Sequence, residues 1–206
     1  MSGTNVTIQP RVFTASAPVY STNSYVIYGG VGAVTGPSAP PISSPFSNYQ
    51  PSTNDWRSLN LPSGGNYTSR ASIVNLGNDT MWIWGGEAQS SSNFSSNVIY
   101  LYDYRASQWL NQINSDWSMR VEHTATLASN NMIYVLGGSN KINNTLLTYS
   151  DFNQIIGFNT QTLSWSNITV GGDVPKGRVS HTTTQVPGKN LLFIYGGVNA
   201  FKDPGK

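Results

Sequence analysis

The chain has 206 residues, of which only 10% are charged, and its formal net charge is +2. Such a weak charge without a basic run argues against nucleic acid as a partner, and apolar runs of about five residues are far shorter than the roughly 20 that span a bilayer. The absence of cysteine excludes disulfides, thiolate metal sites and cysteine nucleophiles.

Residues 1–10 contain the run 5–8, which resembles residues 167–170 in composition and in its position ahead of an arginine. Both runs are predicted to be outer strands, so the chain would begin in the last strand of a preceding sheet. The first residues have neither a basic region nor an apolar core, so the chain is predicted to contain no secretion signal.

Four short apolar runs stop at consecutive glycines, at intervals of about 50 to 60 residues. The runs are residues 25–28, 81–84, 132–136 and 191–195, and the glycines are Gly29, Gly30, Gly85, Gly86, Gly137, Gly138, Gly196 and Gly197. Their β-branched and aromatic residues predict strands buried on both faces. More polar runs precede them, at residues 12–16, 72–76, 124–127 and 182–186. Turn residues between the two runs predict a β-hairpin.

In three of the repeats, an aromatic residue is followed seven positions later by a tryptophan. The pairs are Tyr49 and Trp56, Tyr102 and Trp109, and Phe158 and Trp165. Turn residues between the partners predict a second hairpin, so each repeat would be a four-stranded meander. An arginine opens each repeat, at Arg11, Arg70, Arg120 and Arg178.

This order of arginine, apolar strand, diglycine, aromatic residue and tryptophan resembles the kelch repeat over essentially the whole chain. The resemblance implies an all-β, kelch-type β-propeller like the central domain of galactose oxidase, with one blade per repeat. We expect one domain over residues 1–206. Its parts would be residues 1–10 as the last strand of a preceding blade, repeats at 11–62, 70–118 and 120–175, and a partial repeat at 178–206.

The predicted blades number about three and a half, because the last repeat ends after two strands. A blade that lacks its third strand would leave unpaired strand edges. We therefore expect an incomplete propeller, cut from a larger ring or completed by further blades of a parent chain or another subunit.

The sequence offers little support for catalysis, and no catalytic residue, cofactor or metal is predicted. His123 and His181 occupy the same phase of successive repeats, which favours a structural role beside the inner strand over a metal site. The copper site of galactose oxidase needs a Tyr–Cys crosslink that a chain without cysteine cannot form. The nine carboxylates are scattered, and Glu87, directly after a diglycine, is the best single candidate for a functional one.

The long connections after the diglycines are predicted to share one face of the domain and to carry its function. Their candidate partner-binding residues are Phe46, Glu87, Phe94, Tyr149 and Phe152. The alternative is that these aromatic residues anchor their own loops. We expect a noncatalytic binding or scaffold module for a protein or glycan ligand. A fragment of a carbohydrate-active propeller enzyme and an intracellular adaptor are the other interpretations.

Asn-X-Ser/Thr sequons make the chain resemble a glycoprotein and favour an extracellular or cell-surface location over a cytoplasmic one. The candidate acceptors are Asn66, Asn78, Asn93, Asn143 and Asn167, with a further sequon at Asn5. A surface rich in Asn, Ser and Thr produces several sequons by chance, so this polar surface is the alternative interpretation.

Overall fold

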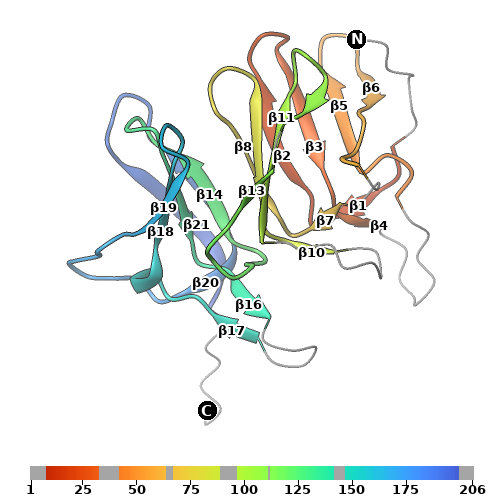
Figure 1. Ribbon diagram of the computed structural model, residues 1–206. Helices are drawn as coiled ribbons and strands as arrows, with labels where there is room; N and C mark the ends of the chain where they lie inside the picture. Colours follow the sequence, from red (N-terminus) through yellow and green to blue (C-terminus); the bar gives the residue numbers. More distant parts are fainter. Residues whose placement is uncertain are drawn as a thin grey trace. The chain divides into compact units, whose positions relative to one another are not determined.

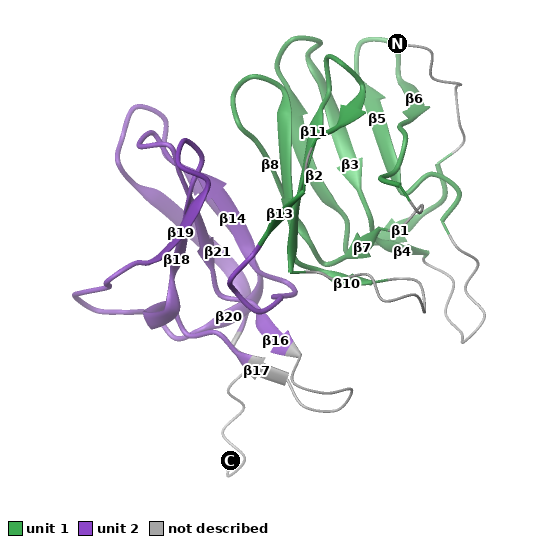
Figure 2. Ribbon diagram, in the orientation of Figure 1, with its two compact units in different colours: residues 1–114 green, residues 115–206 purple. Residues whose placement is uncertain are grey.

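The computed structural model describes residues 8–32, 42–63, 67–88, 97–110, 112–141 and 147–199. The chain divides into two compact units, residues 1–114 and 115–206 (Figure 2). The boundary falls between the second and third repeats, so each unit holds two repeats. No helix among the described residues is long and apolar enough to cross a membrane.

Unit 1 contains two meanders of antiparallel strands, one for each repeat (Figure 1). Its first four-stranded path runs β2-β3-β5-β6 and its second β8-β9-β11-β12, with β13 also paired to β11. The strands are β1 (Arg11–Val12), β2 (Ala15–Val19), β3 (Ser24–Tyr28), β4 (Val31–Gly32), β5 (Phe46–Gln50), β6 (Asp55–Ser58), β7 (Thr68–Ser69), β8 (Ser72–Asn75), β9 (Thr80–Trp84), β10 (Glu87–Ala88), β11 (Val98–Asp103), β12 (Gln108–Trp109) and β13 (Ile113–Asn114).

Unit 2 contains a third meander of order β14-β15-β18-β19 and a two-stranded sheet, β20-β21. Its elements are β14 (Thr124–Leu127), β15 (Met132–Leu136), β16 (Ser139–Lys141), β17 (Leu147–Tyr149), the 3-10 turn η1 (Phe152–Gln154), β18 (Ile156–Asn159), β19 (Ser164–Asn167), β20 (Arg178–Gln185) and β21 (Leu192–Asn199). Among the described residues, three meanders of four strands and the hairpin β20-β21 confirm the prediction of about three and a half blades.

The seven-residue spacing between the aromatic residue and the tryptophan is explained by the strand register. Each pair lies directly cross-strand in the second hairpin of its blade: Tyr49 with Trp56, Tyr102 with Trp109, and Phe158 with Trp165. The ring centroids of these pairs are 4.7, 5.0 and 5.1 Å apart. Such contacts stabilise a sheet beyond the burial of area alone.

Two sequence predictions for the N-terminal part of the chain need correction. The first strand of the first meander is Ala15–Val19 rather than residues 12–16, because Val12 instead pairs with Val31 in the short β1–β4 ladder. Residues 8–10 belong to no strand, and residues 1–7 of the predicted preceding strand lie outside the described residues.

The arginine that opens a repeat donates to the carbonyl of the first glycine in that repeat's diglycine. Arg11, Arg120 and Arg178 each make this bond through Nη1, at 3.4, 3.3 and 3.1 Å. In the second repeat Thr68 donates instead, from Oγ1 to the Gly85 carbonyl at 3.1 Å. The sequence predicted that Arg70 opens its repeat, but Thr68 occupies that position in the structure. Arg70 lies two positions later, and its side chain is available for a different contact.

The two glycines of a diglycine have different neighbours. A Cβ on Gly29 would collide with the carbonyl oxygen of Thr68 in the next repeat, and a Cβ on Gly137 would collide with that of Arg178. A Cβ on Gly138 would lie 2.8 Å from the carbonyl oxygen of Val121, inside the same repeat. The first glycine thus allows one blade to approach the next, and the second allows the segment before the first strand to fold over its own blade.

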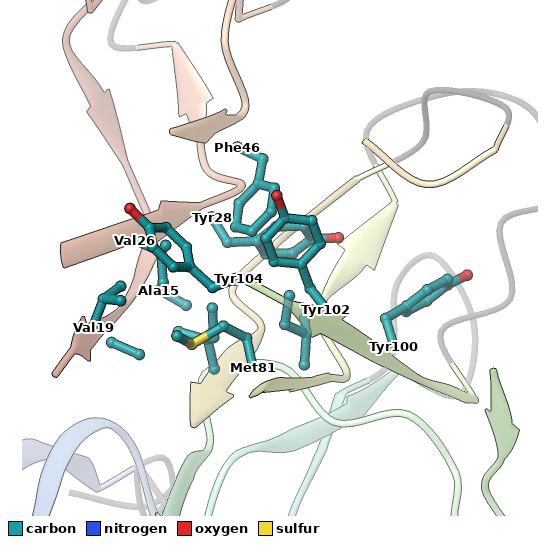
Figure 3. Close-up of a cluster of buried hydrophobic side chains, with 12 residues drawn as sticks. Ala15, Val19, Val26, Tyr28, Phe46, Met81, Tyr100, Tyr102 and Tyr104 are labelled. Carbon is teal, nitrogen blue, oxygen red and sulfur yellow. The ribbon is translucent and has the colours of Figure 1, made fainter. Parts of the chain in front are cut away.

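The core of unit 1 lies between its two meanders. β2 of the first repeat packs beside β8 of the second, and the buried cluster includes Tyr28, Phe46, Met81, Tyr100 and Tyr102 (Figure 3). Phe46 makes edge-to-face contacts with Tyr28 and Tyr102, at centroid distances of 5.8 and 4.8 Å. These large aromatic residues therefore join neighbouring blades within the unit.

A buried carboxylate joins the turns at the opposite end of these two meanders. Asp79 has no exposed side-chain surface, and it accepts hydrogen bonds from the backbone of Tyr20 and Ser21, from Asn75 Nδ2 and from Arg105 Nε at 3.0 to 3.3 Å. Burial alone would raise its pKa, but these donors hold the pKa at about 2, against an ordinary value of 3.8. One side chain thus fixes turns of both repeats.

We expect Gly29→Ala to destabilise the fold by about 2 kcal/mol more than Gly196→Ala. The two glycines occupy the same repeat position with φ of 68° and 72°, so both substitutions cost similar backbone strain. Only Gly29 faces a neighbouring backbone, since a Cβ on Gly196 would meet nothing within 4 Å. Urea unfolding would measure both variants, and equal losses would contradict the inter-blade role of the first glycine.

We expect Asp79→Asn to cost about 2 kcal/mol of stability at neutral pH, from the difference between its folded and ordinary pKa values. The pKa of Asp79 is lower in the folded protein than in the unfolded chain. Its contribution to stability is therefore complete above pH 3.8 and disappears as the pH falls toward about 2. The stabilities of the two proteins should therefore converge on acidification. Asp103→Asn, which removes a carboxylate that caps a turn at the Ala106 amide, is the control. A gap between Asp79→Asn and the native chain that stays constant down to pH 2 would be inconsistent with this role.

Candidate functional site

A residue with left-handed backbone recurs at one position in every repeat, just ahead of the first strand. These residues are Phe13, Arg70, Glu122 and Ser180, with φ of 59°, 58°, 57° and 55°. Positive φ is rare for residues other than glycine and costs about 1 to 2 kcal/mol. The backbone here is therefore constant between repeats while the side chain differs.

The recurring position joins neighbouring repeats within each unit. In unit 1 the amide of Arg70 donates to the carbonyl of Phe13 at 3.0 Å, and in unit 2 the amide of Ser180 donates to that of Glu122 at 3.1 Å. The side chains meet as well, because Ser180 Oγ donates to Glu122 Oε2 at 2.7 Å. The same geometry thus presents two different sets of side chains.

The side chains at this position form an exposed cluster in unit 1. The guanidinium carbon of Arg70 lies 4.0 Å from the centroid of the Phe13 ring, and Arg70 Nη1 lies 2.9 Å from Glu87 Oε2. Phe13 remains 44% exposed and the adjacent Val12 46%. We call Val12, Phe13, Arg70 and Glu87 the diglycine-end cluster. It lies where β1, β4, β7 and β10 gather at one end of the unit (Figure 1).

The diglycine-end cluster combines an apolar surface with an oriented charge. The face of the Phe13 ring holds the Arg70 guanidinium in place by stacking, and the ion pair with the Glu87 carboxylate fixes the orientation of the guanidinium. Aromatic and arginine side chains are the types that contribute most to protein interfaces. The cluster therefore has the chemistry of a protein contact.

The structure separates the predicted partner-binding residues. Phe46 and Phe152 have 0% and 2% exposure, so burial removes them from the candidate surface. Phe46 begins β5 opposite Tyr28, and Phe152 packs 5.6 Å from the ring of His181. Both rings pack on the next repeat, Phe46 against Tyr102 and Phe152 against His181, rather than on their own loops. Their predicted role in partner contact is corrected accordingly.

Glu87 and Tyr149 remain compatible with partner contact. Glu87 is 34% exposed in its ion pair with Arg70, and Tyr149 is partly exposed at the end of β17, paired with Ser139. Phe94 lies outside the described residues. Among the candidate glycosylation sites, Asn78 and Asn167 are exposed, whereas Asn66, Asn93, Asn143 and Asn5 also lie outside the described residues.

The two histidines lie at the first strand of each repeat in unit 2, His123 directly before β14 and His181 within β20. Each is only 5% exposed, and the ring of His181 lies 3.0 Å from Thr124 Oγ1 through Nε2. Burial, followed by the charges of Arg120 and His181, lowers the pKa of His123 to about 3. Burial and the charge of Arg178 lower the pKa of His181 to about 4. Across the described residues, no three His, Asp or Glu side chains converge on a possible metal position.

We expect both histidine rings to stay neutral in the folded protein down to about pH 5, with no titration in their NMR ring resonances above that pH. The unfolded chain protonates them near 6.5, so folding stability should decline as the pH falls from about 6.5 toward 4. A folded-state titration near pH 6.5 for either ring would contradict its burial.

Phe13 and Arg70 are the functional candidates that sequence reasoning missed. A signal is present in the sequence at the third residue of four aligned tripeptides, where the residue type changes while the residue before it stays small or β-branched. The tripeptides are Arg-Val-Phe, Thr-Ser-Arg, Arg-Val-Glu and Arg-Val-Ser. The pattern is hard to see in the sequence because Arg70 resembles the arginines that open the other repeats. The Thr68 bond to the Gly85 carbonyl and the left-handed backbone of Arg70 set the phase of the second repeat.

The sequence and the fold of this chain are similar to those of known kelch-repeat proteins. Residues 4–197 match a family model described as the KLHDC2/KLHL20/DRC7 kelch-repeats domain. The chain is 28% identical over 142 residues to the Rab9 effector protein with kelch motifs of Xenopus laevis, a stretch that covers 66% of this chain and 36% of that protein. The structure of YjhT superposes with a TM-score of 0.66 at 15% identity, over 91% of this chain and 59% of that one. The chain thus spans about a third of the curated relative and somewhat more than half of YjhT.

Proposed function

The chain belongs to the kelch-repeat family, and we propose that it is a noncatalytic protein-interaction module that binds its partner through the diglycine-end cluster of unit 1. The observation that carries this proposal is the exposed contact of Phe13, Arg70 and Glu87 on a backbone that the repeat holds in a left-handed conformation.

The cluster is preorganised for binding, because the Arg70 side chain, which could adopt many rotamers, is already held in one of them. The Phe13 ring and the Glu87 carboxylate hold the Arg70 side chain, which keeps 25% of its surface exposed. Ordering such a side chain only on binding would cost roughly 0.5 to 1.5 kcal/mol. Val12 and Phe13 add apolar surface beside this charge.

The partner we propose is a protein rather than a glycan. The similar Xenopus laevis protein is named an effector, which supports a protein ligand. Charged and aromatic side chains in contact also suit a protein surface with a complementary carboxylate and an apolar residue. A glycan ligand and a catalytic parent protein are the alternatives that binding experiments should separate.

Partner capture tests the proposal through Phe13→Ala and Arg70→Glu, compared with Tyr25→Ala. Tyr25 is a matched control, because it is 47% exposed and lies on β3, outside the cluster. Crosslinking of the purified variants in a cell extract, followed by mass spectrometry, would identify proteins lost from both cluster variants. We expect a loss of about tenfold for each cluster variant, which equals about 1.4 kcal/mol, and no loss for Tyr25→Ala.

A repaired ion pair provides the second arm. Arg70→Glu combined with Glu87→Arg restores an attraction between the two positions but reverses the charges that a partner meets. Recovery of folding stability without recovery of binding is the expected result. Retention of every captured protein by Phe13→Ala and Arg70→Glu would refute the proposed surface, and capture of glycans with unchanged protein binding would favour the alternative.

A further inference from the structure

A groove opens in unit 1 at the turn end of the blades, away from the diglycine-end cluster. Its volume is about 710 Å³, and its walls come from the outer strands of the first repeat and the β11–β12 turn of the second. This volume lies within the range of about 300 to 1,000 Å³ that is usual for ligand sites. Its lining residues include Asn48, Gln50, Arg57, Asn60 and Arg105.

Several of the groove's walls are fixed by hydrogen bonds within the fold. Asn48 Nδ2 donates to Ser24 Oγ at 2.7 Å, and Gln50 Nε2 donates to the carbonyl of Thr22 at 3.2 Å. The carbonyl of Asn60 accepts from Trp109 Nε1 at 2.8 Å, which connects the outer strand of one repeat to the next. A site with walls held in this way loses little conformational entropy when it binds a ligand.

The groove carries two cations and no carboxylate among its lining residues. Asp79 holds Arg105 at Nε, and the Arg105 side chain remains 63% exposed. Arg57 is exposed on β6, and within the described ranges it has no ion-pair or hydrogen-bonding partner. The carboxylates beside Arg105 are engaged, since Asp79 accepts four donors and Asp103 caps the turn at the amide of Ala106.

We propose that this groove binds an acidic peptide segment of a partner protein, independently of the diglycine-end cluster. Arg57 supplies the unpaired charge for a carboxylate, and the terminal nitrogens of Arg105 add a second donor group. The amide nitrogens of Asn48 and Gln50 are committed within the fold, so their side-chain oxygens are the groups that would accept from the N–H groups of a peptide. In the described part of the sheet β6 pairs only with β5, so an extended peptide meets a strand edge beside Arg57.

Fluorescence anisotropy with the full chain tests this site. The probe is a short fluorescein-labelled peptide of alternating Glu and Ser, and its control is a peptide of the same length with Gln in place of Glu. We expect the Glu peptide to bind at least about tenfold more tightly, and its Kd to rise about tenfold in Arg57→Glu. Lys176→Glu is the matched control, because it reverses an exposed charge outside the groove and should leave the Kd unchanged.

Backbone amide NMR with the same peptides keeps the test independent of any loss of folding. Shifts confined to the groove strands and the β11–β12 turn are expected with the Glu peptide, and Phe13→Ala should leave them unchanged. Equal binding of the two peptides, or equal weakening by Arg57→Glu and Lys176→Glu, would overturn the proposal. Displacement of the Glu peptide by an equivalent concentration of inorganic phosphate would reduce the site to a simple anion site and overturn it too. A negative result for Arg57→Glu would count only against the groove and would not affect the proposal for the diglycine-end cluster, so the two proposals can be contradicted separately.

Discussion

The close approach of one repeat's backbone to the first glycine of the preceding diglycine is the constraint on which the fold depends. At Gly29 the carbonyl of Thr68 occupies the space that a Cβ would need, and at Gly137 the carbonyl of Arg178 does the same. No residue with a side chain fits this position without moving the neighbouring blade. The position of each repeat against the next within a unit is thus set at a backbone contact.

The same contact explains why the surface chemistry differs between repeats while the backbone does not. The segment that reaches the preceding diglycine also contains the left-handed residue, and its amide donates to the equivalent residue of the preceding repeat. Phe13 and Arg70 are joined in this way in unit 1, and Glu122 and Ser180 in unit 2. A fixed main chain leaves the side chains at this position free to differ from one repeat to the next.

The two ends of unit 1 are stabilised by different forces. At the diglycine end, backbone approach and a half-exposed stack of Arg70 on Phe13 join the repeats. At the turn end, the buried carboxylate of Asp79 collects donors from both repeats, and its charge also holds Arg105 at the groove. Each proposed binding surface therefore contains an arginine that is positioned by a contact between repeats.

The sequence by itself determined the repeat, the strand order and the cross-strand pairs. The spacings that encode Tyr49 with Trp56 or the hairpin before Gly85 are local, and local periodicity follows directly from strand geometry. Only the tertiary structure decided which aromatic residues are accessible, since Phe46 and Phe152 look alike in sequence to any loop aromatic and become buried through distant partners. It also decided the phase of Arg70, because the bond that identifies Thr68 as its repeat's opening residue is made across 17 residues of chain. The candidate surfaces arise from contacts between separate repeats, and no local pattern records which side chains such contacts bring together.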